Sequence, residues 1–108
     1  MNKAKVFDKE LQRVAAFAKI LSHPARLMIL NYLSEKKVCI SGDITKEIPL
    51  SRTTVSQHLK ELKNIGLIKG EIEGLKINYC LCNTKINEMK SKFNEFMNKI
   101  ETKTESFC

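Results

Sequence analysis

Hydrophobic side chains recur at alternating steps of four and three residues along the first part of the chain. This spacing gathers them on one face of a helix, because an α-helix turns once every ~3.6 residues. We therefore predict a first helix over residues 7–21. The residues on this face are Phe7, Leu11, Val14, Ala18 and Leu21.

A second helix is predicted to begin at the Ser-His-Pro sequence of residues 22–24. Ser22 is a suitable N-cap, and proline is tolerated in the first turn of a helix. Three leucines continue the buried face, and Lys36 near the end of the helix suits its dipole. These leucines are Leu27, Leu30 and Leu33.

The middle of the chain predicts a helix-turn-helix. A β-prone stretch at 38–40 precedes a short helix over 44–48, which Pro49 ends. A longer helix then runs from Ser51, a good N-cap, to Gly66, which can end it in the left-handed conformation. Its apolar stripe consists of Val55, Leu59, Leu62 and Ile65.

A β-hairpin and a last helix follow. Strands over 67–71 and 75–82 flank a tight turn at 73–74, and the second strand alternates apolar and polar residues. A final helix over 84–101, capped by Asn83, carries a nearly heptad apolar face. That face holds Ile86, Met89, Phe93, Phe96 or Met97, and Ile100.

The predicted fold is therefore mainly α with a small β-hairpin, a winged helix-turn-helix in the order α-α-β-α-α-β-β-α. The whole chain, residues 1–108, fits one such domain. A core of this size gives modest stability, so pairing with a second copy would help.

The charge balance points to a polyanionic partner. Lys and Arg total 19 against 12 acidic residues, a net charge of +7 that suits nucleic acid or an acidic membrane, although surplus surface lysines would give the same value. The longest aliphatic run, 27–30, is far too short to cross a membrane, and the charged N-terminus is unlike a signal peptide. We expect a cytoplasmic protein without a membrane partner, whose four cysteines are mainly thiols.

The longer helix of the helix-turn-helix leaves polar side chains outward when its apolar stripe is buried. Arg can pair with guanine, Gln with adenine, and hydroxyls with phosphates or bases, so this face suits the major groove of double-stranded DNA. Every surface helix has a solvated polar face, and the whole order of elements is what favours DNA. The candidate DNA-binding residues here are Ser51, Arg52, Thr53, Thr54, Ser56, Gln57, His58 and Lys60.

The predicted hairpin would act as the wing beside this helix. Lys69, Lys76 and Asn78 are placed to contact the DNA backbone or minor groove. Glu71 and Glu73 near the tip argue mildly against deep insertion into a groove.

Three stretches resemble the ArsR/SmtB family of winged-helix repressors. They are Leu-Ser-His-Pro-Ala-Arg-Leu-Met-Ile-Leu at 21–30, Ser-Arg-Thr-Thr-Val-Ser-Gln-His-Leu-Lys-Glu-Leu at 51–62, and the hairpin at 66–81. The resemblance covers roughly residues 10–83. It implies a homodimer built from the first and last helices, repression of its own operon, and release on binding an inducer.

The apolar pattern agrees with a homodimer, because helices 7–21 and 84–101 carry more apolar surface than so small a core needs. Two-fold symmetry would set two recognition helices one DNA turn apart, so the operator should be an imperfect inverted repeat. Packing of the two helices within one chain would use the same residues. The candidate interface residues are Phe7, Leu11, Val14, Phe93, Met97 and Ile100, with Phe17 and Phe96 beside them.

The resemblance implies inducer-binding thiols shortly before Asp43, but Ile40 and Gly42 occupy those positions. The last helix has no His, so the family's zinc site on that helix is not expected. Both departures put the usual metal sites in doubt.

Strand alternation predicts a different thiol site. Cys39, Cys80 and Cys82 should share the outer face of the small sheet, where cross-strand Cβ atoms lie about 5 Å apart. Three thiolates suit arsenite or antimonite, and zinc or cadmium would take Cys108 as a fourth ligand. These ions would be inducers, and no cofactor is expected to be required for folding. A Cys39–Cys80 or Cys39–Cys82 disulfide is the redox alternative. The simplest alternative is that all four cysteines are inert.

No Ser-His-Asp, Cys-His or paired-carboxylate set indicates an active site, so we do not predict an enzyme. The sequence favours a DNA-binding repressor released by arsenite or a similar soft ligand. A redox-sensing or inducer-free repressor and a winged-helix protein-interaction module are the alternatives.

Overall fold

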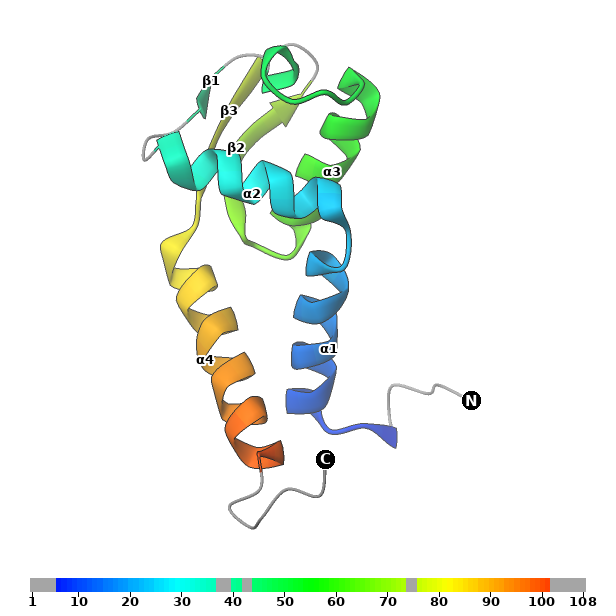
Figure 1. The fold of residues 1–108 in the computed structure, drawn as a ribbon, viewed down its shortest axis with the longest axis vertical. Helices are drawn as coiled ribbons and strands as arrows, with labels where there is room; N and C mark the ends of the chain where they lie inside the picture. The colour runs from blue at the N-terminus through cyan, green and yellow to red at the C-terminus, as the bar shows by residue number, and fades with distance from the viewer. Residues whose placement is uncertain (1–5, 37–39, 42–43, 74–75, 102–108) are drawn as a thin grey trace.

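The computed structural model describes residues 6–36, 40–41, 44–73 and 76–101. Figure 1 shows α2, α3 and the sheet at one end of the molecule, with α1 and α4 extending side by side from it. None of the described helices is both long and apolar enough to span a membrane. The elements are α1 (Lys9–Leu21), α2 (Pro24–Lys36), β1 (Ile40–Ser41), η2 (Ile44–Lys46), α3 (Arg52–Asn64), β2 (Ile68–Glu73), β3 (Lys76–Leu81) and α4 (Asn83–Ile100).

The mainly α fold with a β-hairpin is confirmed, but the predicted short helix over 44–48 is only a 3-10 turn, η2. Too few residues precede Pro49, which has no amide hydrogen, for an α-helix to propagate. Ile44 and Ile48 are nevertheless 2% and 3% exposed. The turn is therefore anchored in the core although it is not an α-helix.

The junction between α1 and α2 also differs from the prediction. Ser22, expected to cap α2, instead closes α1, because its hydroxyl donates to the Lys19 carbonyl at 2.6 Å. His23 serves the start of α2, since its Nδ1 accepts a hydrogen bond from the Ala25 amide at 3.3 Å. One ring nitrogen of His23 is thus committed to the backbone.

Two further helix starts are shifted. α1 begins at Lys9, later than predicted, because the Asp8 carboxylate accepts a hydrogen bond from the Glu10 amide at 2.6 Å. α4 begins at Asn83, and Cys82 rather than Asn83 is its N-cap, without a side-chain hydrogen bond at that end. The later start removes Phe7 from the apolar face of α1, and the apolar face of α4 is unchanged.

The three strands form one antiparallel sheet in the order β1-β3-β2. The short β1 pairs with β3, the second strand of the hairpin, with Ile40 opposite Tyr79. The Cys82 amide donates to the Leu67 carbonyl at 2.8 Å. This hydrogen bond joins the two ends of the hairpin at its base.

The hydrophobic core lies where α2, α3 and the sheet meet. In the predicted stripe of α3, Val55, Leu59 and Leu62 are buried, whereas Ile65 is half-buried just beyond the end of the helix. In α2 only Leu33 of the three predicted leucines is buried. Leu30 is half-buried and Leu27 is 47% exposed, because α2 turns Ala25 and Ile29 inward instead. Buried core residues here include Ile29, Leu33, Ile44, Val55, Leu59, Leu62, Leu67, Ile68 and Tyr79.

α1 and α4 contact each other through an aromatic pair and an ion pair. The ring centroids of Phe17 and Phe93 lie 6.2 Å apart, and Arg13 Nη1 lies 3.0 Å from Glu88 Oε1. Phe17 is only 2% exposed. Its predicted place in a dimer interface is therefore wrong, and Phe93 makes its aromatic contact within its own chain.

Gly70, on β2, occupies a position that tolerates no side chain. Its φ is 129°, and a Cβ built there would lie 2.0 Å from the Asn78 carbonyl oxygen. Gly66 also has a positive φ, 91°, but its Cβ would meet only the flexible side chain of Lys85, at 3.3 Å.

We expect Gly70→Ala to lower the free energy of unfolding by at least about 3 kcal/mol, because backbone strain and overlap with β3 must both be relieved. Gly66→Ala is the matched control, because it introduces backbone strain without an overlap with β3. It should lower the free energy of unfolding by about 1 kcal/mol. Urea denaturation followed by circular dichroism measures both values. Equal losses would contradict the close approach at Gly70.

Candidate nucleic-acid interface

α3 begins at a capped N-terminus. Ser51 Oγ accepts a hydrogen bond from the Thr54 amide at 3.2 Å and donates to the Thr54 hydroxyl at 2.8 Å. The predicted N-cap is therefore confirmed. The partial positive charge at this end of the helix favours an anion such as a phosphate.

α3 has one buried face and one polar face. Val55, Leu59 and Leu62 are 2%, 0% and 0% exposed and hold the helix on the core. The opposite face presents hydrogen-bond donors and acceptors to solvent, mostly along the N-terminal half. Its exposed members are Ser51, Arg52, Thr53, Gln57 and Lys60, and Thr54 and Ser56 are half-buried.

His58 does not belong to the exposed face, and its predicted role in DNA binding is wrong. It is 8% exposed, its ring packs edge-on against His23 with centroids 4.4 Å apart, and its Nδ1 accepts a hydrogen bond from Arg26 Nε at 3.2 Å. Burial lowers the pKa of His58 below its ordinary value, and the charges of His23 and Arg26 lower it further. Its position between Val55 and Leu59 already indicated burial, because all three share one helical face.

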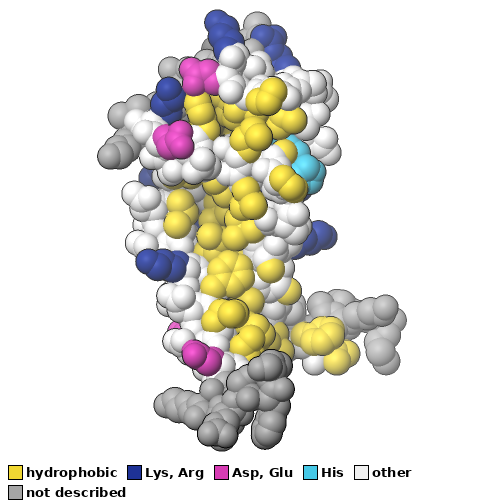
Figure 2. Space-filling view, in the orientation of Figure 1, with side chains coloured by type: hydrophobic (Ala, Val, Ile, Leu, Met, Phe, Trp, Pro, Cys, Tyr) yellow, Lys and Arg dark blue, Asp and Glu magenta, His cyan; other side chains and the backbone are white. Residues whose placement is uncertain are grey.

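The hairpin lies beside α3 and carries part of the predicted wing. Lys69 is exposed on β2, opposite Cys80 in the register of the sheet, and Asn78 is exposed on β3. Lys76 lies opposite Glu73 in the backbone register of the hairpin, and the side chains of both fall outside the described part of the structure. Figure 2 shows Lys and Arg side chains at the end of the molecule where the hairpin and α3 lie.

The described cysteines lie where β3 meets α4. Cys80 is disulfide-bonded, whereas Cys82 is a free, half-buried thiol. The expectation of thiols is therefore correct for Cys82 and wrong for Cys80. The other two predicted ligands, Cys39 and Cys108, lie outside the described residues. The Cys39–Cys82 disulfide is excluded because Cys82 is free. Over the described ranges, no three His, Cys, Asp or Glu side chains are grouped to hold a metal ion.

Comparison with known proteins identifies the helix-turn-helix. The family model described as "Bacterial regulatory protein, arsR family" matches residues 23–69, from the α1–α2 junction into β2. The HTH-type transcriptional regulator YgaV of Escherichia coli (strain K12) is 36% identical over 76 residues, covering 70% of this chain and 77% of YgaV. The chain belongs to the ArsR family.

A second relative agrees with this ArsR assignment, and a solved structure shares the fold. The cadmium resistance transcriptional regulatory protein CadC of Listeria innocua is 35% identical over 85 residues, which cover 78% of this chain and 71% of that protein. An ArsR-like transcriptional regulator from Rhodococcus sp. RHA1 has the same fold, with a TM-score of 0.67 and 20% identity over 85% of this chain and 86% of that one. This ArsR-family protein is a DNA-binding transcriptional regulator and not an enzyme.

Two residues of the ArsR-matched region were missed by the sequence pattern. Arg26 on α2 forms an ion pair with Glu61 on α3 in addition to its bond to His58. Both lie in stretches that carry the family resemblance, but no periodicity indicates that a side chain of one helix meets a side chain of the other. The spacing of His58 and Glu61, about one helical turn, was the available signal.

Proposed function

We propose that this protein is a cytoplasmic, homodimeric repressor that leaves its operator when a soft ion, most simply arsenite or antimonite, binds its thiols. The operator would be an imperfect inverted repeat in double-stranded DNA. The observation that carries the proposal is the polar N-terminal half of α3, which is held outward by the buried face of the same helix.

The exposed face of α3 supports binding in the major groove. Arg52 is proposed to recognise guanine and Gln57 adenine, since these pairings match in hydrogen-bond geometry. The hydroxyls and Lys60 would hold phosphates, with Lys69 and Lys76 of the wing on the adjoining backbone. The net charge of +7 favours association with a polyanion.

The incomplete burial of α4 supports a homodimer. No residue of this helix is buried, although its apolar face runs its whole length. Exposed apolar side chains continue across α1 and α4, and Figure 2 shows a band of hydrophobic surface between these helices. A second copy of the chain would cover this band. On the two helices, Leu11 is 45%, Met97 57% and Ile100 54% exposed, and Phe7, just before α1, is 57% exposed.

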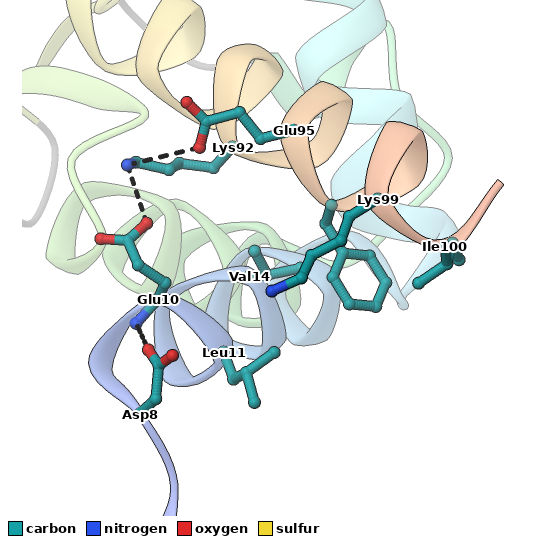
Figure 3. A pocket seen from close by; sticks show the side chains of 9 residues that line it. Asp8, Glu10, Leu11, Val14, Lys92, Glu95, Lys99 and Ile100 are labelled. Carbon is teal, nitrogen blue, oxygen red and sulfur yellow. Dashed lines mark hydrogen bonds and ion pairs between the residues drawn. The ribbon is translucent and has the colours of Figure 1, made fainter. Parts of the chain in front are cut away.

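A hollow of about 510 Å³ between α1 and α4 lies in the same band. Figure 3 shows Lys92 from α4 on one side of it, bridging to Glu10 on α1 at 2.7 Å and to Glu95 at 3.7 Å. Asp8 and Lys99 also line it, together with apolar side chains. We propose that apolar side chains of the second copy fill it. Its apolar lining includes Leu11, Val14, Phe96 and Ile100.

The disulfide at Cys80 supports a thiol-based inducer site, because it puts a second sulfur within covalent reach of this residue. Ile40 lies opposite Tyr79 in the sheet, and Cys39 and Cys80 are the sequence neighbours of that pair. We therefore propose Cys39 and Cys80 as ligands in the reduced protein, with Cys82 or Cys108 as a third. Each thiol that binds arsenite would replace one hydroxyl on arsenic and release one water.

The same disulfide favours a second candidate function, control by oxidation. Two thiols that can form a disulfide can be oxidised by peroxide or by another disulfide, with loss of two electrons and two protons. Under this alternative the oxidised form, and not an ion complex, would leave the operator.

Gln57→Ala is expected to weaken binding to a duplex selected by the wild-type protein by about 1–3 kcal/mol, because it removes a base contact. Asn64→Ala is the matched control, a neutral substitution at the other end of the same helix. Mobility shifts at fixed salt measure both. If Gln57→Ala and Arg52→Ala both bind the duplex as tightly as the wild type, the proposed interface is refuted. If the wild-type protein selects no duplex, a protein-interaction module is favoured instead.

Met97→Glu is expected to weaken self-association by at least about 2 kcal/mol, because a carboxylate would be buried in the apolar contact. Ser91→Glu adds the same charge to an exposed position of α4 away from the apolar face. Sedimentation equilibrium at several concentrations compares the two. A dimer unaffected by Met97→Glu, or a wild-type monomer, would refute the interface.

Cys80→Ser is expected to keep operator binding but to lose release by arsenite, because an alcohol does not replace a thiolate as a soft ligand. Wild-type protein reduced beforehand is titrated with arsenite, antimonite, cadmium or zinc, and separately with peroxide. Release by peroxide alone would identify the redox alternative. If arsenite still fully releases Cys80→Ser from the DNA, Cys80 is not a ligand of the inducer. The same test on Cys82→Ser decides whether Cys82 is the third ligand.

A further inference from the structure

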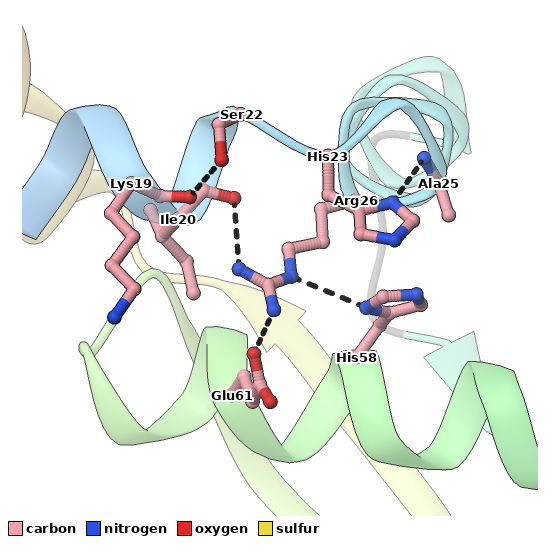
Figure 4. Close-up of polar contacts among 8 residues, drawn as sticks. All are labelled: Lys19, Ile20, Ser22, His23, Ala25, Arg26, His58 and Glu61. Atoms are coloured by element: carbon pink, nitrogen blue, oxygen red, sulfur yellow. Dashed lines mark hydrogen bonds and ion pairs between the residues drawn. The ribbon is translucent and has the colours of Figure 1, made fainter.

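The Arg26 guanidinium joins three elements of the fold. Its Nε donates to His58 Nδ1 at 3.2 Å, and another nitrogen forms the ion pair with Glu61, so two contacts reach α3. Its third nitrogen donates to the Ile20 carbonyl at 3.4 Å, near the end of α1. Figure 4 shows the guanidinium between the end of α1 above and α3 below. We call Arg26, His58 and Glu61 the Arg26 joint.

The joint requires one protonation state of His58. Arg26 Nε always carries hydrogen, so it can only donate. His58 Nδ1 must therefore hold a lone pair, and the neutral ring carries its hydrogen on Nε2. A proton on Nδ1 would set two donors and two positive charges against each other, and the bond from Arg26 would be lost.

The position of the joint gives it a role in DNA binding. It ties α3, which presents the polar face, to α1, which carries part of the proposed dimer interface. The angle between these helices sets where the two α3 helices of a dimer lie, and inverted-repeat operators require a fixed separation. A lost joint would therefore weaken binding to the operator more than binding to random DNA.

We propose that Arg26 positions α3 for the operator through His58 and Glu61, and that a proton on His58 releases α3 and weakens specific DNA binding. This inference rests on the proposed operator binding. It assigns His58 and Arg26 as positioning residues, because neither is proposed to touch DNA. It makes the regulator sensitive to acid independently of its thiols.

The groups facing His58 decide the direction of the pH effect. His23 from the α1–α2 junction and Arg26 from α2 both disfavour a charged His58, and Glu61 on α3 is engaged by the guanidinium. The pKa of His58 is thus lower in the joined state than its ordinary value of 6.5. When Arg26 no longer bonds to His58, the ring takes up a proton at a higher pH than when the bond is present. The state with the bond is therefore favoured above pH 6.5, and its population falls as the pH drops below 6.5.

The test compares a duplex selected by the wild-type protein with a random duplex at pH 7.5 and 5.5, at one salt concentration. The ratio of the two affinities cancels the general effect of protein charge. We expect this ratio to fall about three- to tenfold at the lower pH, since one coupled proton changes affinity by at most tenfold per pH unit.

Two histidine variants separate the joint from other titrations. Asn offers an amide oxygen near the position of Nδ1 and takes up no proton, so His58→Asn should retain specific binding at pH 7.5 and change less than about twofold at pH 5.5. His23→Asn keeps an acceptor for the Ala25 amide and leaves the bond from Arg26 to His58 in place, so its affinity ratio should still fall at pH 5.5, although less than in the wild type because one charge facing His58 is gone. A wild-type response in His58→Asn, or a lost response in His23→Asn, would overturn the proposal.

A DNA-free measurement keeps the inference separate from the proposed function. Nitrogen NMR of the full wild-type chain at pH 7.5 should show His58 Nδ1 unprotonated and Nε2 protonated. The opposite tautomer would overturn the joint even if operator binding is found. A constant affinity ratio would overturn the acid response. If no duplex is selected, the proposed operator binding itself fails, and the acid response fails with it.

Discussion

Val55, Leu59 and Leu62 are buried in the core and fix how α3 lies on it. These side chains share one face of α3, so burying all three leaves a single orientation of the helix about its own axis. Turning the helix to expose one leucine would cost about 2 kcal/mol of hydrophobic free energy. The polar face that includes Arg52 and Gln57 is exposed because the apolar face is not.

The spacing of apolar residues predicted α1, α2, α3, α4 and the two strands of the hairpin, because it has a period near 3.6 in the helices and of two in the strands. It failed where local hydrogen bonds decide. Ser22 had an acceptor in the preceding helix as well as a donor in the following one, and sequence alone did not rank the two. In α2 apolar residues occur on several sides, so the pattern did not reveal that Ile29 and not Leu27 faces the core.

The candidate site was also predictable in part: its exposed residues could be read from the sequence, but its contacts between helices could not. The exposed members of α3 follow directly from its apolar stripe, and the same stripe should have removed His58 from them. The role of Arg26 depends on how two helices cross, which no spacing within either helix encodes. The cysteines were predicted from strand alternation, and the structure adds that Cys80 and Cys82 are in different chemical states.

The hydrogen bond between the Cys82 amide and the Leu67 carbonyl has a consequence for how this fold varies. It closes the hairpin into a loop whose two ends meet at a fixed point, so changes in length at the far tip do not alter where α3 stops or α4 starts. Insertions and deletions there are absorbed locally. The length of this arm can therefore change without moving the two helices that meet at its base.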